Sequence, residues 1–292
     1  MGTFALLTLI WGTTWAVIRI GLEGIPPFAG VALRFAIASA LLLILGLAMG
    51  VRFGRGRHEV GLWFANALLS FCTSYGVVYW VEQWVPSGLN SVLFATFPLF
   101  VAVLAHFALP GERLTPLSVI GILLGFGGVA VIFSEDFARL GGPRVAFAAV
   151  VMLVSPLVSS FATVAVKRWG REIHPVSLTA VPMGMASVIM GSLSLLLERD
   201  AEFSFDVTSV GALAYLAVLG SAVTFTLYFW MLRHVAATRL SIIAYLVPLM
   251  AVGIGTTVLD EPLTARTVAG SLLVVLGVAL TVGSGGRRGG RE

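Results

Sequence analysis

The feature that most limits how this chain can fold is an internal duplication. Much of the segment from residue 79 to residue 128 recurs about 150 positions later in a chain of 292 residues. A repeat this long, used only twice, indicates one structural unit present in two copies and not a solenoid of many short units. The matching pairs are Trp80 with Trp230, Ser91 with Ser241, Pro98 with Pro248, Glu112 with Glu261, Gly121 with Gly270 and Gly128 with Gly277, with a fainter echo of Arg19 in Lys167 and of Pro27 in Pro175.

Long apolar runs separated by short breaks fill both copies. Apolar residues make up 58% of the chain and charged residues 11%, with a mean hydropathy of +1.00, whereas a soluble domain carries about 25% charged residues. Because about 20 apolar residues span a bilayer as a helix, the runs predict transmembrane helices. We expect ten spans: Phe4–Leu22, Phe28–Gly50, Val60–Val81, Gly88–Leu109, Pro116–Phe133, Val145–Val166, Pro175–Leu197, Thr208–Leu232, Thr238–Leu259 and Thr264–Gly283.

These spans predict an all-α integral membrane protein. Backbone groups in hydrocarbon must bond within their own element, and the sequence lacks the alternating segments of a membrane β-barrel. Five spans per copy is an odd number, so the second copy crosses the membrane in the opposite sense and the two five-helix repeats are inverted. We expect the first repeat over residues 1–140, the second over 141–284, and a flexible cytoplasmic tail over 285–292.

The distribution of Lys and Arg among the loops predicts the orientation. The loops on the side of the two termini, together with the tail, carry twelve such residues, and the opposite side carries five. Positive charge concentrates on the cytoplasmic side of membrane proteins, so we expect both termini in the cytoplasm. The basic residues lie between apolar segments and form no amphipathic face, so no nucleic-acid partner is expected.

Short motifs in a fixed order resemble those of a known family. Over essentially the whole chain they are similar to the EamA-type branch of the drug/metabolite transporter superfamily, and within it to bacterial aromatic amino-acid exporters. The resemblance implies a protein of the bacterial inner membrane that exports small metabolites through a central cavity by alternating access. The motifs are Trp11-Gly12-Thr13-Thr14-Trp15, Pro26-Pro27, Leu33-Arg34-Phe35, Gly111-Glu112-Arg113-Leu114-Thr115 and its echo Asp260-Glu261-Pro262-Leu263-Thr264.

The duplication indicates the same class of protein on physical grounds. Inverted repeats with interrupted helices are typical of secondary transporters, which hold substrate near the membrane midplane between the repeats. An enzyme is not expected, because no HExxH, CxxC or GxSxG motif occurs, and neither a cofactor nor a metal is expected. The expected partners are a small-molecule substrate and the lipid bilayer, with the chain a monomer or a weak homodimer.

Polar and aromatic side chains form stripes at helical spacing inside several expected spans. Each stripe has two interpretations, interhelical packing or the lining of a substrate cavity; for Trp11 a third is an aromatic belt at the membrane interface. We favour the cavity for Tyr75, Tyr79 and Tyr245, because a tyrosine hydroxyl deep in a span needs a partner. The candidate cavity residues are Trp11, Trp15, Arg34, Tyr75, Tyr79, Phe94, Pro98, Ser155, Ser159, Thr163, Thr224, Tyr228, Ser241, Tyr245 and Pro248.

Four prolines lie in the middle of expected spans, and each removes a backbone hydrogen-bond donor. A carbonyl freed in this way could bind an ammonium group or a water, or the proline could only mark a kink. Because Pro98 and Pro248 are equivalent in the two copies, we expect a paired bend that shapes the cavity and flexes during transport. The four are Pro98, Pro156, Pro182 and Pro248, which free the carbonyls of Phe94, Met152, Leu178 and Ala244.

Charges are scarce inside the expected spans. Arg34 is the only formal charge well inside one, where it costs roughly 2.5–3.5 kcal/mol at a helix centre. It could snorkel to the outer surface, tie down the loop that carries Glu23, or contact a substrate carboxylate. Glu112 and Glu261 lie in equivalent loops and are expected to be helix caps or partners of other loops. No Asp or Glu falls well inside an expected span, which favours facilitated diffusion or exchange over proton-driven antiport.

The candidate cavity is aromatic, rich in hydroxyls and almost uncharged, which bears on the class of substrate. Phosphate-bearing substrates need several Lys or Arg groups, so a neutral zwitterion or an aromatic amino acid fits better. Cation–π contacts with Trp and Tyr also suit organic cations, so a multidrug exporter is the alternative.

Glycines at helical spacing predict where spans pack closely. Gly121 and Gly125 lie four apart in the fifth expected span, and Gly270 and Gly277 lie seven apart in the tenth. Small residues let helix backbones approach in membranes. We therefore expect the fifth and tenth spans to stand outside the cavity as supports.

Overall fold

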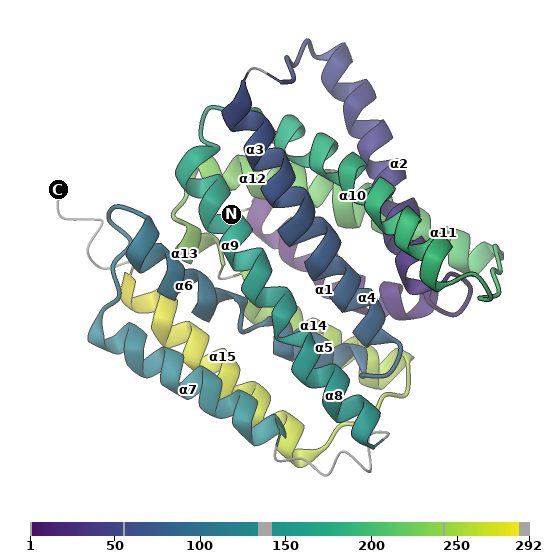
Figure 1. Cartoon of the computed structure of the whole chain (residues 1–292). Helices are drawn as coiled ribbons and strands as arrows, with labels where there is room; N and C mark the ends of the chain where they lie inside the picture. The colour runs from purple at the N-terminus through teal and green to yellow at the C-terminus, as the bar shows by residue number, and fades with distance from the viewer. Residues whose placement is uncertain (1, 55, 134–141, 242, 286–292) are drawn as a thin grey trace.

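The fold is a bundle of apolar helices (Figure 1). The computed structural model describes residues 2–54, 56–133, 142–241 and 243–285, and each regular element in these ranges is a helix. Within them, ten continuous or locally interrupted rods correspond to the ten expected spans. The rods are α1 (Gly2–Gly21), α2 (Pro27–Ala48), α3–η1–α4 (Arg57–Asn66, Ala67–Ser74, Tyr75–Glu82), α5–α6 (Ser87–Phe94, Phe97–Ala108), α7 (Pro116–Phe133), α8–α9 (Pro143–Met152, Val154–Trp169), α10 (Pro175–Leu197), α11–η3–α12 (Val207–Ala217, Val218–Val223, Thr224–His234), α13–α14 (Ala237–Leu240, Ile243–Val258) and α15 (Ala265–Gly285).

Proline sets the start of several rods. Helices α2, α7, α8 and α10 each begin on a proline, at Pro27, Pro116, Pro143 and Pro175. The first turn of a helix has no use for the missing N–H, and the fixed φ of proline suits it. After α2 the chain turns through Gly50, whose φ of 69° lies in the left-handed region that glycine adopts at low cost.

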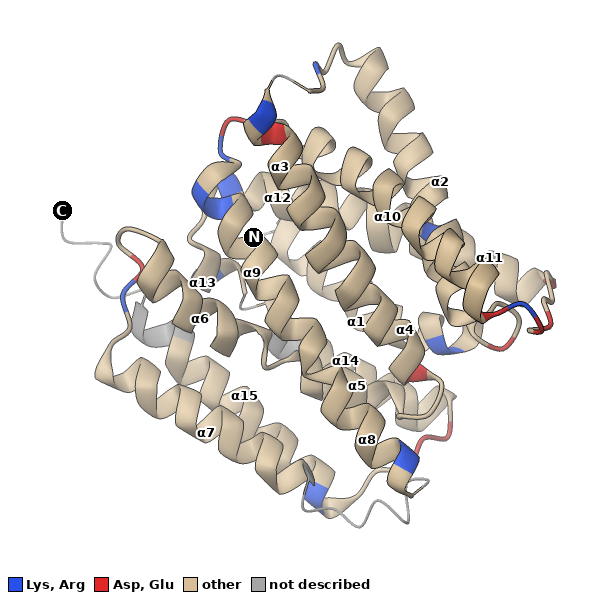
Figure 2. Cartoon of the chain, viewed as in Figure 1, with Lys and Arg blue, Asp and Glu red and all other residues tan. Residues whose placement is uncertain are grey.

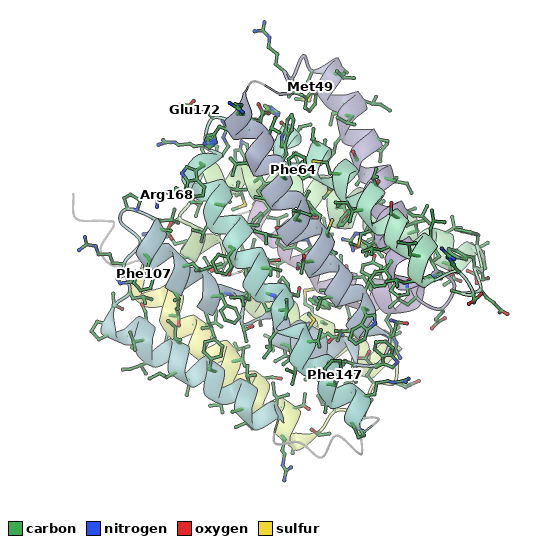
Figure 3. The ribbon with its side chains drawn as sticks, in the orientation of Figure 1. Met49, Phe64, Phe107, Phe147, Arg168 and Glu172 are labelled. Atoms are coloured by element: carbon green, nitrogen blue, oxygen red, sulfur yellow. The ribbon has the colours of Figure 1, made fainter. Side chains whose placement is uncertain are left out.

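The outer surface of the bundle is apolar. Seven rods are long and apolar enough to cross a membrane, and three shorter apolar helices lie within α7, α14 and α15. Figure 3 shows Met49, Phe64, Phe107 and Phe147 pointing away from the ribbon, and the Phe107 side chain is 79% exposed. Side chains of this kind around the whole bundle fit contact with hydrocarbon and not with water.

Helices α7 and α15 lie side by side, and their glycine contacts reveal the relation between the two halves (Figure 1). A Cβ at Gly121 would lie 2.5 Å from the Gly277 carbonyl, and one at Gly128 would lie 2.6 Å from the Gly270 carbonyl. The order of contacts is reversed, so the helices are antiparallel. Because Gly121 corresponds to Gly270 and Gly128 to Gly277, each contact is the copy of the other under a twofold axis. The two five-helix repeats are therefore inverted.

Helices α2 and α10 form a second antiparallel pair of the same kind. The Ser39 hydroxyl donates to the Ala180 carbonyl at 2.8 Å, and a Cβ at Gly191 would contact Ala32 at 3.8 Å. These two helices are also equivalent in the duplication, since Pro27 and Pro175 begin them. The twofold relation thus holds on both sides of the bundle.

Both copies carry a π-helical stretch at the same place. In the first copy it is η1, and 150 positions later in the second copy it is η3, between α11 and α12. A π-helical turn holds more residues than an α-helical turn, so it rotates the side chains that follow, and such turns are frequent at functional sites.

The rods that contain Pro98 and Pro248 are interrupted at positions that are not equivalent, and the expected paired bend at these prolines stays a prediction. Helix α5 ends at a turn over Ala95 and Thr96, and Pro98 is the second residue of α6, whereas Pro248 lies inside the continuous helix α14. The second copy is interrupted earlier, at Ser241. The interruption after α5 has a physical reason in its side chains. The Thr96 hydroxyl donates to the Leu93 carbonyl at 2.7 Å and satisfies the end of α5, whereas the equivalent residue in the second copy, Leu246, has no hydroxyl.

The other prolines have local roles. Pro156 is the third residue of α9, just after the turn at Leu153. Pro182 lies inside α10, and the Leu178 carbonyl that it frees accepts a hydrogen bond from the Asn66 side-chain amide at 2.9 Å. This carbonyl therefore holds two helices together and is not available to an ammonium group.

Two expectations fall on residues that the structure does not describe. The predicted boundary between the repeats, at residues 140 and 141, lies outside the described ranges, and so does the predicted tail beyond Gly285. Both stay predictions.

Candidate substrate cavity and its two ends

A cavity of about 120 Å³ lies between the two repeats. Helices α1, α4, α5, α6, α9, α12, α13 and α14, together with η1, supply its walls. None of the lining residues comes from α7 or α15, in agreement with the expected supporting role of those helices. Eight candidate residues line it, namely Trp11, Trp15, Tyr75, Phe94, Ser159, Thr163, Tyr228 and Ser241.

Aromatic rings from both repeats form the apolar wall. The Trp11 ring centroid lies 5.6 Å from that of Phe225 and 5.4 Å from that of Tyr228, and Trp15 lies 5.7 Å from Phe94. The Trp11 indole nitrogen is buried and has no hydrogen-bond partner among the described residues. A buried N–H without a partner costs about 1–3 kcal/mol, so an acceptor on a bound molecule would stabilise this site.

Hydroxyl groups from α9 and η1 form the polar wall. The Ser159 hydroxyl donates to that of Ser74 at 2.8 Å, and Ser74 and Ser155 share a hydrogen bond at 2.7 Å. One turn further along α9, Thr163 lies 3.4 Å from the Tyr228 hydroxyl. The described residues that line the cavity include no Asp, Glu, Lys or Arg, so the site offers rings and hydroxyls and no formal charge.

Arg34 is fully buried and lies one side chain away from the cavity. Its Nε donates to the Ser221 hydroxyl at 2.7 Å and its Nη2 to the Gly220 carbonyl at 2.9 Å, both in η3. Its guanidinium carbon stands 4.8 Å from the ring centre of Tyr75, which does line the cavity. The expectations that Arg34 snorkels or holds the loop of Glu23 are therefore wrong, because the π-helical carbonyl and hydroxyl offer nearer acceptors.

Five other candidates lie behind the lining or along the rods. The Tyr79 hydroxyl accepts from Arg34 Nη1 at 3.3 Å, Ser155 is held by Ser74, and the Thr224 hydroxyl is buried without a partner among the described residues. Pro98 and Pro248 are buried in α6 and α14 away from the lining. The side chain of Tyr245 lies outside the described residues.

Several lining residues were missed by the sequence reasoning. Thr14, Ser70, Ser74 and Phe225 line the cavity although no stripe included them. Ser91 also lines it, and the duplication could have found it, because Ser91 is the copy of the candidate Ser241. Each of these two hydroxyls donates to the carbonyl three residues earlier, at 2.6 Å and 2.8 Å.

Equivalent carboxylates cap helices at the two ends of the bundle, as expected. Glu112 accepts from the backbone N–H groups of Ala237 at 3.1 Å and Thr238 at 3.0 Å. Glu261 accepts from those of Ser87 at 2.7 Å and Gly88 at 3.0 Å. An anion at a helix N-terminus satisfies orphan donors and the helix dipole. Each contact joins one repeat to the other.

Equivalent cations also hold carbonyls at the two ends. Lys167 donates to the Leu232 and Val235 carbonyls, both at 2.8 Å, and Arg19 donates to the Glu82 carbonyl. We call the end with Lys167 the basic end and the end with Glu82 the acidic end. In Figure 2, Lys and Arg are prominent near the ends of α9 and α3, at the basic end, and Asp and Glu in the loop that precedes α11, at the acidic end.

The acidic end contains a carboxylate that the sequence reasoning did not foresee. Glu82 is the last residue of α4 and is fully buried, with Oε2 at 2.6 Å from the side-chain amide of Asn90. Its Oε1 has no partner among the described residues. Charged residues at the end of an apolar run are expected to reach water, and here the packing of α5 on α4 prevents it.

The basic end is hollowed. A vestibule of about 470 Å³ is lined by the ends of α6, α9 and α12, and Phe229 lines both this vestibule and the central cavity. In the loop that leads to α10, partial burial and then the Arg233 guanidinium lower the pKa of His174. His174 is therefore neutral at pH 7, and its Nδ1 accepts from the Val176 N–H at 3.3 Å.

Comparison with known proteins decides the family. The sequence profile of the EamA-like transporter family matches the chain twice, over residues 2–134 and 146–283. The chain belongs to the EamA-like transporter family. Two matches in one chain agree with the inverted repeats, and membership makes this EamA-like protein a multi-pass membrane transporter.

Curated relatives match the EamA-like chain along almost its whole length. An uncharacterized transporter of Bacillus subtilis, YoaV, is 27% identical over 97% of this chain and 96% of its own. An uncharacterized inner membrane transporter of Escherichia coli, YedA, is 29% identical over 97% and 90%. Protein PagO of Salmonella typhimurium is 23% identical over 96% and 91%. None of these names gives a substrate, so the narrower resemblance to the aromatic amino-acid exporter YddG stays a prediction.

A solved crystal structure shares the fold of this EamA-like protein. It has a TM-score of 0.72 and 20% sequence identity, and the match covers 96% of this chain and 95% of the other. At this identity the likeness concerns the fold alone.

Proposed function

We propose that this EamA-like transporter exports amino acids with aromatic or other neutral side chains, and related small metabolites, across the inner membrane by alternating access. The observation that carries the proposal is the central cavity, where rings face hydroxyls and a buried indole N–H has no partner in the part of the chain that the structure describes. Rings stack on an aromatic side chain, and the Trp11 N–H and the hydroxyls of Ser159 and Thr163 suit a carboxylate and an amino group.

The inverted repeats support alternating access. Each half can adopt the conformation that the other has just left, and the cavity lies where the halves meet. Helices α5–α6 and α13–α14 are interrupted beside the cavity, so these rods can bend while α7 and α15 remain packed.

The alternative substrate is an organic cation. Trp11, Trp15 and Tyr75 present ring faces that attract cations. The cavity lacks a carboxylate that would hold a cation more firmly, at least among the described lining residues. This favours the zwitterion, whose two charges can be met by hydroxyls and by the indole.

A counterflow assay tests the proposal. Purified protein in vesicles preloaded with one solute is offered labelled aromatic amino acids, quaternary amines and sugar phosphates. We expect trans-stimulated uptake of aromatic amino acids in the wild type and in Trp169→Phe, whose ring lies outside the cavity and is 52% exposed. Uptake of quaternary amines alone would select the alternative, and uptake without saturation or trans-stimulation would indicate a channel.

The same vesicles test the coupling. We expect exchange or facilitated diffusion, because no carboxylate lines the described part of the cavity. Accumulation of substrate driven by an imposed pH gradient would contradict this part of the proposal.

A further inference from the structure

The vestibule at the basic end carries a concentrated positive charge. Lys167, Arg168, Arg171 and Arg233 line it, and the carboxylate among its lining residues is Glu112. Glu112 is engaged by two backbone N–H groups and by the Thr238 hydroxyl at 2.9 Å. In a concave site with apolar walls, a field of one sign is focused and raises the local concentration of oppositely charged solutes.

The cations are held in place but keep donors to spare. Arg233 Nε donates to the Arg171 carbonyl at 2.7 Å, and Arg168 Nη1 to the Ala108 carbonyl at 2.7 Å. An arginine has five N–H donors, so most donors of Arg168 and Arg233 remain for a solute, while Lys167 keeps one of its three. Backbone carbonyls anchor them without neutralising their charge.

The duplication does not account for this charge. At the acidic end the equivalents of Lys167, Arg168, Arg171 and Arg233 are Arg19, Ile20, Glu23 and Gln83. These four cations belong to the twelve that the sequence places on the side of the termini, so the general excess of cations there accounts for their sign but not for their arrangement around one hollow. Arg52 and Arg57 lie at the same end but are exposed and do not line the vestibule.

We propose that the vestibule is an anion-selective entrance that captures solutes through an ionised carboxylate and repels organic cations before they reach Phe229. This inference rests on the proposed function, because it assigns a class of solute to the same pathway. The carboxylate would lie between the guanidinium groups of Arg168 and Arg171, and the apolar part of the solute would face Phe229 and the cavity beyond it.

Inhibition by ring compounds of opposite charge tests the proposal. Membrane vesicles of both orientations are offered labelled phenylalanine, with 3-phenylpropanoate or phenethylamine as competitor. The test variant is R168Q/R171Q, and the matched control is R52Q/R57Q, which removes the same charge at the same end. In the test variant we expect the inhibition constant of 3-phenylpropanoate to rise roughly five-fold at low salt, as for the loss of two partly exposed ion pairs, and that of phenethylamine to fall.

Salt concentration and lipid composition provide two further controls for the inhibition experiment. The five-fold effect should shrink in about 0.5 M salt, where charges are screened over a few ångströms. It should persist in vesicles of phosphatidylcholine alone. If the test variant instead changes only the binding of phosphatidylglycerol, the cations serve lipid and the proposal is overturned. Equal inhibition constants in test and control variants, in both vesicle orientations, would also overturn it.

A binding measurement separates this inference from the proposed function. If no amino acid is transported, the purified protein in detergent is titrated with 3-phenylpropanoate and its thermal unfolding followed. Ligand that binds the folded state raises the unfolding temperature. A smaller rise in R168Q/R171Q than in R52Q/R57Q supports the vestibule even then, and equal rises overturn it.

Discussion

The two ends of the bundle have the same backbone plan and different seals. At each end a cation holds a carbonyl of the neighbouring rod, and a glutamate caps the rod that follows. Beside this shared frame the acidic end buries Glu82 and Asn90, while the equivalent positions at the basic end are Leu232 and Leu240, which are 1% and 0% exposed. The hollow beside Glu261 measures about 10 Å³, against about 470 Å³ beside Lys167.

The two ends share a mechanism of opening that follows from symmetry, but their side chains give them different free energies of closing. A twofold frame lets either end open by the same motion, but the free energy of closing depends on what is buried. Burying leucine side chains is favourable. Burying the Glu82 carboxylate and the Asn90 amide costs hydration, because one oxygen of each finds no partner within the described ranges. We infer that separating the two repeats costs less free energy per unit of buried area at the acidic end than at the basic end.

The strongest way to break the comparison is to separate the helices on which the twofold frame depends. A leucine at Gly121 would clash with the backbone of Gly277 and Thr281, so Gly121→Leu should lower the yield of folded protein in detergent about ten-fold or more. Gly127→Leu is the matched control, because it lies on the same helix with nothing within 4 Å. The residual Gly121→Leu protein should keep the substrate preference; an altered preference would count against the supporting role of α7 and α15.

Making the acidic end resemble the basic end tests the seals directly. Asn90→Leu alone removes the amide that donates to the buried Glu82 carboxylate and should lower the free energy of unfolding by about 1–3 kcal/mol. The double variant Glu82→Leu/Asn90→Leu should recover most of that loss, since apolar side chains then fill the site. Thermal unfolding of both variants checks this. A double variant no more stable than Asn90→Leu would show that the site needs its charge.

Substituting the two capping glutamates compares the ends through a smaller change in the free energy of unfolding. Glu112→Gln and Glu261→Gln each weaken two backbone hydrogen bonds at a helix N-terminus and should cost about 1–2 kcal/mol. The loss should be larger for Glu112→Gln, because Glu112 also accepts a hydrogen bond from the Thr238 hydroxyl at 2.9 Å. The unfolding temperatures of the two variants check this, and a larger loss for Glu261→Gln would contradict the hydrogen-bonding difference between the ends.

The smallest expected effect concerns the cavity that both ends share. Trp11→Phe keeps an aromatic ring and removes the unpartnered indole N–H. We expect KM for an aromatic amino acid to rise about five-fold, the value of one hydrogen bond of about 1 kcal/mol, in both vesicle orientations. An effect on entry from one side alone would place Trp11 in one gate and not in the common site.

Both members of the α1 stripe line the cavity, as do Ser159 and Thr163 of the three-residue α9 stripe, whereas α4 and α12 each place only one member of a pair on the lining. Tyr75 lines the cavity and Tyr79, four residues later, bonds Arg34 behind it. Likewise Tyr228 lines it and Thr224 does not. Tyr75 and Tyr79 lie in the regular α-helix α4, and Thr224 and Tyr228 in α12, so each pair shares one face. Tyr79 and Thr224 lie one turn, about 5.4 Å, along that face from the residue that lines the cavity, and the local sequence does not show where along a helix a cavity ends.

What the sequence determined by itself follows from local and additive quantities. The length of each apolar run fixed where a helix crosses the membrane, and the odd number of spans per copy fixed the inversion of the second repeat. What only the tertiary structure decided depends on neighbours: the burial of Glu82, the bonds of Arg34 to η3, and the gathering of four cations around one hollow. These arise where rods distant in the chain meet, because a side chain's environment is set by packing and not by its position in its own helix.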